Sequence, residues 1–92
     1  MPKIVMYSTL FCPYCMRAKA LLDSKGVDYE ELRIEGDQER MREMIQRANG
    51  RNSVPQIFID DYHVGGYDDM AALDRAGKLD PLLETPARHA TA

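Results

Sequence analysis

The sequence predicts an α/β fold in which a four-stranded mixed sheet is flanked by helices, with the main elements in the order βαβαββα. Three patterns support this class. The N-terminal part reads as strand, helix and strand, which so short a stretch can connect only as a right-handed parallel crossover. A helix with one apolar face follows. After it come a β-hairpin and another helix, so that parallel and antiparallel strands share the sheet.

Each early element has a local signal. The stretch Ile4-Val5-Met6-Tyr7 is continuously apolar, as in a strand covered on both faces. Pro13 suits the first turn of a helix, because its φ is preset and its missing N–H would have no partner there. Gly26 ends that helix. The next helix has apolar residues at i, i+3, i+4 and i+7, the pattern of a helix packed on one side. These residues are Met41, Met44, Ile45 and Ala48.

The second half follows the same logic. Asp60-Asp61 turns one short strand back into the next. Asp80 and Pro81 predict an N-cap and a first-position proline for a short final helix. The expected strands are 3–7, 27–34, 56–59 and 62–64, and the expected helices start at residues 13, 37, 67 and 81. Residues 1–84 form the predicted domain, and residues 85–92, which lack periodicity, form a predicted disordered tail.

Composition limits the function. The 92 residues suffice for one domain, and the net charge is −3 with both signs interspersed. This balance argues against the clustered basic surface of a nucleic-acid-binding protein. No stretch approaches the roughly 20 apolar residues of a membrane span, and the N-terminus has no signal-peptide pattern. We therefore expect a cytoplasmic protein, monomeric by default, that binds neither nucleic acid nor membrane.

Both cysteines lie in one stretch, Cys12-Pro13-Tyr14-Cys15. At the start of a helix they are one turn apart on one face, which suits a disulfide that opens and closes without large backbone movement. Two alternatives are a structural disulfide and half of a metal site. A structural disulfide usually closes a longer loop than this one. Unpaired N–H groups at a helix N-terminus favour the thiolate, so Cys12 is the predicted nucleophile. Cys15, one turn deeper, is the predicted resolving cysteine.

The element order, with Cys-x-x-Cys after the first strand, resembles the thioredoxin fold. Three motifs narrow the resemblance to the glutaredoxin family, and specifically to its small bacterial dithiol members. They are Cys12-Pro13-Tyr14-Cys15, Ser53-Val54-Pro55 and Gly65-Gly66-Tyr67-Asp68-Asp69, which are similar to the family's active site, Thr-Val-Pro loop and Gly-Gly-x-Asp-Asp turn.

The resemblance implies a glutathione-disulfide oxidoreductase that takes part in electron transport and in cell redox homeostasis. Its substrates would be glutathionylated or disulfide-bonded proteins. Glutathione would be the reducing co-substrate, and glutathione reductase would be an indirect partner through glutathione. We expect no tightly bound cofactor and no metal.

The resemblance also implies a cis Pro55 facing Cys12, which leaves the Val54 backbone free to pair with an extended peptide. Physical chemistry supports a glutathione site in the same region, because the N–H groups at Tyr67 and Asp68 could bind a carboxylate and the Asp68 side chain could accept an amine. Arg51 resembles the family's basic residue for the glycyl carboxylate. The expected glutathione-binding residues are Tyr14, Arg51, Val54, Pro55, Gly66, Tyr67 and Asp68. Asp69 is read mainly as a helix-capping acid.

Departures from the family pattern leave alternatives open. Thr9 stands where the family often has a lysine, and Tyr67 where a small residue or cysteine is common. Both could weaken glutathione binding. One alternative is a redoxin reduced by thioredoxin reductase, and another is a dimer that binds an iron–sulfur cluster through Cys12 and glutathione. His63 and His89 lack metal-ligand spacing to the cysteines and are read as ordinary surface residues.

Overall fold

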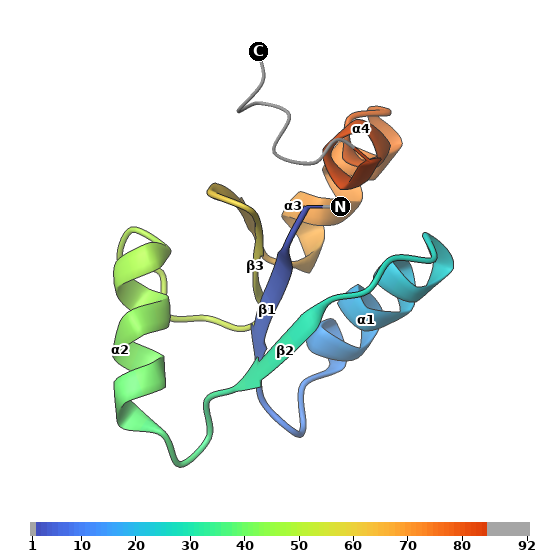
Figure 1. Ribbon diagram of the computed structural model, residues 1–92. Coiled ribbons are helices and arrows are strands. Elements are labelled where there is room, and N and C mark those ends of the chain that lie inside the picture. The colour runs from blue at the N-terminus through green and yellow to red at the C-terminus, as the bar shows by residue number, and fades with distance from the viewer. Residues whose placement is uncertain (1, 85–92) are drawn as a thin grey trace.

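The structure is a computed structural model that describes residues 2–84 of the chain. Every predicted element has a counterpart in the order in which it was expected (Figure 1). The elements are β1 (Ile4–Ser8), α1 (Pro13–Ser24), β2 (Glu30–Arg33), α2 (Gln38–Arg47), β3 (Gln56–Ile59), β4 (Tyr62–Gly65), α3 (Tyr67–Arg75) and α4 (Leu79–Glu84). The predicted tail, residues 85–92, lies outside the described residues.

The four strands form one mixed sheet in the order β2-β1-β3-β4. β1 pairs in parallel with β2 and antiparallel with β3, and β3 forms the antiparallel hairpin with β4. All five residues of β1 are buried, as its continuously apolar sequence predicts for a central strand. The predicted α/β class and mixed sheet are therefore confirmed.

Helices cover both faces of the sheet (Figure 1). One face packs against α1, α3 and α4 through a core that includes Met6, Leu22, Ile57 and Met70. The other face packs against α2 through Tyr7, Phe58, Met44 and Ala48. Because side chains alternate along a strand, adjacent residues of β1 serve opposite cores.

Three features of the elements differ from the predictions. β2 is shorter than the predicted strand, because only Glu30–Arg33 lies opposite β1. Met41 was predicted on the packed side of α2 but is 38% exposed, so the contact of that helix centres on Met44 and Ala48. α4 begins at Leu79, so Asp80 is not its N-cap. The Asp80 carboxylate instead pairs with Lys25.

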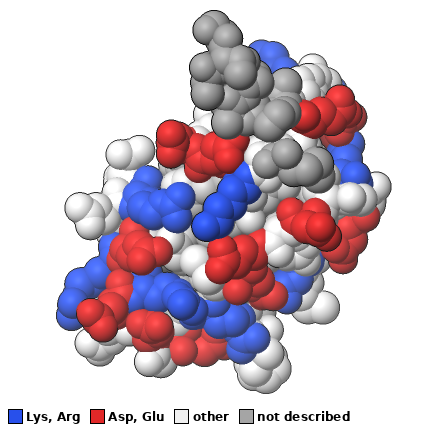
Figure 2. All heavy atoms as spheres, viewed as in Figure 1, with Lys and Arg blue, Asp and Glu red and all other residues white. Residues whose placement is uncertain are grey.

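Charged side chains of both signs are interspersed on the face shown in Figure 2. Several form ion pairs, including Lys19 with Glu31 at 2.8 Å and Arg33 with Glu35 at 2.7 Å. Within residues 2–84, no helix combines the length and the hydrophobicity needed to cross a membrane.

Candidate active site

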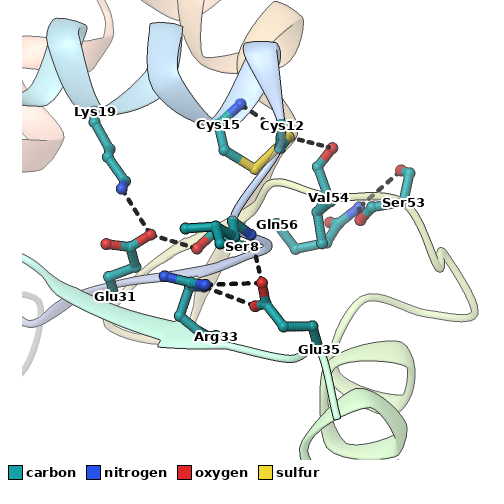
Figure 3. The surroundings of a disulfide bond; sticks show 11 residues. Ser8, Cys12, Cys15, Lys19, Glu31, Arg33, Glu35, Ser53, Val54 and Gln56 are labelled. Atoms are coloured by element: carbon teal, nitrogen blue, oxygen red, sulfur yellow. Dashed lines mark hydrogen bonds and ion pairs between the residues drawn. A yellow bond between two sulfur atoms is a disulfide. The ribbon is translucent and has the colours of Figure 1, made fainter. Parts of the chain in front are cut away.

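The two cysteines meet at the start of α1, where they form a disulfide with their Cα atoms 5.1 Å apart (Figure 3). Cys12 is the N-cap residue, and its Sγ accepts a hydrogen bond from the Cys15 N–H at 3.1 Å. Cys12 is 8% exposed and Cys15 is 1% exposed. When the disulfide is open, this N–H donor and the helix N-terminus favour a thiolate at Cys12, the more exposed of the two residues.

The segment before β3 lies beside the disulfide (Figure 3). The peptide bond between Val54 and Pro55 is cis, which confirms the prediction for Pro55. The Val54 carbonyl oxygen lies 3.8 Å from Cys12 Sγ. A ligand whose sulfur reaches Cys12 would therefore meet the backbone of this segment.

A groove of about 190 Å³ runs between this segment, the start of α3 and Tyr14. The residues that line it are Tyr14, Arg51, Ser53, Val54, Pro55, Gly66, Tyr67, Asp68 and Asp69. The structure thus brings together all seven residues that the sequence predicts for glutathione, from three separate parts of the chain. Their binding role stays a prediction.

The start of α3 is held by Asp69, in agreement with its reading as a capping acid. Its Oδ2 accepts hydrogen bonds from the Gly66 N–H at 2.8 Å and from Arg51 Nη1 at 3.2 Å. The Gly66 N–H, and then Arg51, lower the pKa of Asp69 against the opposing effect of burial. Arg51, predicted to reach a ligand carboxylate, therefore already has an anionic neighbour inside the groove.

Sequence reasoning missed the residues that anchor the loop before Cys12. The Glu35 carboxylate accepts a hydrogen bond from the Leu10 N–H at 2.6 Å and forms an ion pair with Arg33. The hydrogen bonds from Arg33 are the largest cause that lowers the pKa of Glu35 to about 2. Glu31 likewise accepts from the Ser8 hydroxyl. The available signal was topological: β1 and β2 are parallel, so the residues that end or follow them meet at one edge of the sheet.

Exposed apolar side chains lie next to the two cysteines in the sequence. Phe11 is 91% exposed, and Leu10, Tyr14 and Met16 are also exposed. The Arg17 guanidinium lies 5.3 Å from the centre of the Tyr14 ring.

The interpretation of His63 as an ordinary surface residue is wrong. Its ring is half-buried and stacks on Phe58 with the ring centres 4.8 Å apart, and its Nε2 lies 2.7 Å from Gln56 Oε1. Burial, followed by the charges of Arg51 and Arg47, lowers the pKa of His63. His89 lies outside the described residues. Within residues 2–84, no cluster of three or more His, Cys, Asp or Glu side chains could hold a metal ion.

Comparison with known proteins assigns the family. Residues 4–64 match the family model described as glutaredoxin. The chain belongs to the glutaredoxin family. Glutaredoxin 3 of Escherichia coli strain K12 is 56% identical over 84 residues, which are 91% of this chain and 100% of that relative. A glutaredoxin of Pseudomonas aeruginosa is 54% identical over 83 residues, covering 90% of this chain and 98% of the relative.

Solved glutaredoxin structures share the fold. The solution structure of glutaredoxin from Brucella melitensis has a TM-score of 0.81 at 49% identity, covering 92% of this chain and 91% of that one. The crystal structure of a buckwheat glutaredoxin–glutathione complex also has a TM-score of 0.81, at 32% identity over 89% of this chain and 76% of that one. The fold is therefore the thioredoxin fold of the glutaredoxins, and the general reaction class is thiol–disulfide exchange.

Proposed function

We propose that this protein is a glutathione-dependent oxidoreductase that reduces protein–glutathione mixed disulfides and protein disulfides, with Cys12 as nucleophile and Cys15 as resolving cysteine. One observation carries the proposal: the sulfur of Cys12, the N-cap cysteine, lies beside the Val54 carbonyl oxygen at one wall of the groove. All seven predicted glutathione-binding residues line this groove. The glutathione named in the buckwheat complex supports the same ligand class. A reducing compartment such as the cytoplasm suits this chemistry.

The groove offers a complement to each part of glutathione. The first N–H groups of α3, at Tyr67 and Asp68, have no acceptor within the helix and would receive the γ-glutamyl carboxylate. The exposed Asp68 carboxylate would accept its amine. Val54 would pair with the peptide backbone as a strand edge does. Arg51 would bind the glycyl carboxylate, which would compete for the guanidinium with the Asp69 carboxylate, whose Oδ2 lies 3.2 Å from Arg51 Nη1.

Reduction of a glutathione mixed disulfide needs only Cys12. Its thiolate attacks the glutathione sulfur, the protein sulfur leaves as a thiolate and takes up a proton, and Cys12 becomes glutathionylated. The thiolate of a second glutathione then attacks this glutathione sulfur. Oxidised glutathione leaves, and the Cys12 thiolate is restored.

Reduction of a protein disulfide uses both cysteines. Cys12 attacks one substrate sulfur and releases the other as a thiol, and Cys15 then attacks Cys12 Sγ to free the substrate. The product is the disulfide seen in the structure. Two glutathione molecules reopen it and leave as oxidised glutathione, which glutathione reductase reduces back to two glutathione molecules at the expense of NADPH.

The test is the reduction of a small glutathione mixed disulfide with glutathione, glutathione reductase and NADPH. We expect Cys12→Ser to lose activity by at least about a hundredfold, since the nucleophile is gone. Cys15→Ser should retain this activity but fail to reduce a protein disulfide. Full activity of Cys12→Ser would refute the assignment.

Two further arms address the alternatives. If only thioredoxin reductase and NADPH support turnover of the wild-type protein, the redoxin alternative replaces glutathione dependence. If anaerobic reconstitution with iron, sulfide and glutathione yields a coloured dimer, the cluster carrier is supported instead.

A further inference from the structure

Gln56 is a fully buried polar residue that neither the reaction nor the glutathione contacts account for. It is the first residue of β3, directly after the cis Pro55. Its Nε2 lies 3.0 Å from the Ser53 carbonyl oxygen and 3.3 Å from Ser53 Oγ (Figure 3). Because a carbonyl oxygen can only accept, chemistry requires the NH₂ of Gln56 to face Ser53.

This orientation determines what the other end of the amide does. Gln56 Oε1 then faces His63 Nε2 at 2.7 Å, and since an amide oxygen only accepts, Nε2 must carry the proton. His63 is itself held by stacking on Phe58, its partner across the β3–β4 ladder. A relay of hydrogen bonds thus runs from the His63 ring through Gln56 to both oxygens of Ser53.

The relay ends in the wall of the groove. Ser53, Val54 and Pro55 all line it, and the Val54 carbonyl oxygen lies 3.8 Å from Cys12 Sγ. The geometry points to Gln56 and His63 as positioning residues, which touch neither glutathione nor the cysteines but hold the 53–55 segment in the arrangement that forms the groove. This inference rests on the proposed function.

The charged groups around the imidazole agree with a neutral His63. Arg47 and Arg51 act against its protonation, and Asp69 acts in the opposite sense. Arg47 packs on the Phe58 ring with its guanidinium 4.2 Å from the ring centre. A neutral ring with its proton on Nε2 satisfies Gln56 without adding a charge to this half-buried cluster.

The relay predicts a separation of binding from chemistry. Gln56→Glu keeps the shape and the acceptor for His63 but has no NH₂ to donate to Ser53. We expect it to raise KM for a glutathione mixed disulfide about tenfold while kcat changes by less than about twofold, because the groove contacts substrate before and during the reaction. His63→Phe, which keeps the stacked ring, should raise KM about threefold, because Gln56 loses one of its partners.

Tyr7→Phe is the matched control. Tyr7 is equally buried on the same face of the sheet, and its hydroxyl bonds to Glu43 and Arg47 on α2 instead of to the groove. It should lower stability with an unchanged KM. A folded Gln56→Glu protein with the wild-type KM would overturn the inference, and so would an equal rise of KM in Tyr7→Phe.

NMR separates failure of the relay from failure of the proposed function. The imidazole ¹⁵N signals should show the proton of His63 on Nε2, and Gln56→Glu should raise the His63 pKa, because a carboxylate favours the charged ring. The Ser53 and Val54 amide signals should shift in the same variant. These readouts need no turnover, so an inactive wild-type protein would refute glutathione chemistry alone, whereas unshifted Ser53 and Val54 signals would refute the relay.

Discussion

Gly65 lies at the end of β4 with a φ of 108°, in the region that favours glycine. A Cβ added here would lie 2.8 Å from Arg51 Nη1 and closer still to Asp69 Oδ2. The same carboxylate caps α3 through the Gly66 N–H, and the same arginine lines the groove. One missing side chain therefore permits the turn, the helix cap and the ion pair at once.

We predict that Gly65→Ala lowers the free energy of unfolding by about 2–3 kcal/mol, from roughly 1–2 kcal/mol of backbone cost and about 1 kcal/mol for the displaced cap. Urea unfolding measures it. The control is Gly77→Ala, at a φ of 74° with no neighbouring atom within 4 Å, which should lose only the backbone part. Equal losses in the two variants would show that the contacts at Gly65 contribute nothing.

At the scale of an element, α2 shows that tertiary packing decides which residues of an apolar helix stripe are buried. Met41 and Met44 both fall on its apolar stripe, yet Met44 is fully buried against the sheet and Met41 is 38% exposed. Asp37 is the N-cap residue that precedes the helix, and its carboxylate accepts a hydrogen bond from the Arg40 N–H at 2.9 Å. The N-cap and the buried Met44 and Ala48 hold this helix against the sheet, whereas Met41 contributes little.

The matched pair Met44→Ala and Met41→Ala tests this. We expect Met44→Ala to lower the free energy of unfolding by about 2–5 kcal/mol through lost burial and a residual cavity. Met41→Ala should change it by less than about 1 kcal/mol, since its side chain already meets water. Thermal or urea unfolding decides, and similar losses would contradict the packing of α2.

At the scale of the whole molecule, Lys25 joins three helices. It follows the last residue of α1, and its Nζ lies 2.6 Å from an Asp74 oxygen on α3 and 2.8 Å from an Asp80 oxygen on α4. Hydrogen bonds from Asp74, and then Asp80, raise the pKa of Lys25 above its usual 10.5. The C-terminal helices are thereby attached to the βαβ unit by charge as well as by the buried Leu79 and Leu83.

We expect Lys25→Met to lower Tm by a few degrees, with the loss reduced in about 1 M salt, which screens exposed ion pairs. A raised pKa means that the lysine contributes stability below pH 10.5 and loses it as the pH rises through the raised value. The difference from wild type should therefore shrink in alkaline solution. Lys78→Met is the control, because Lys78 is exposed and makes no ion pair within residues 2–84.

Sequence alone determined the features that depend on local chemistry. Continuous or alternating apolar residues specify strands, Pro13 and Gly26 delimit a helix, and cysteines three positions apart at a helix start can form a disulfide. The family resemblance, with Arg51 beside the three motifs, added the cis Pro55 and seven of the nine residues that line the groove, which sequence spacing could not have placed. For this reason the α/β class, the mixed sheet and the composition of the groove were all predictable.

Only the tertiary structure decided how residues distant in sequence pair. The Glu35 carboxylate anchors the loop before Cys12. The Asp69 carboxylate pairs with Arg51, which also lines the groove. Hydrogen bonds connect the His63 ring to Ser53 through Gln56. No hydrophobic periodicity or sequence motif predicts these contacts, because each depends on where two separate elements end after packing. The sheet order β2-β1-β3-β4 brings those ends together, and that order is a property of the folded chain as a whole.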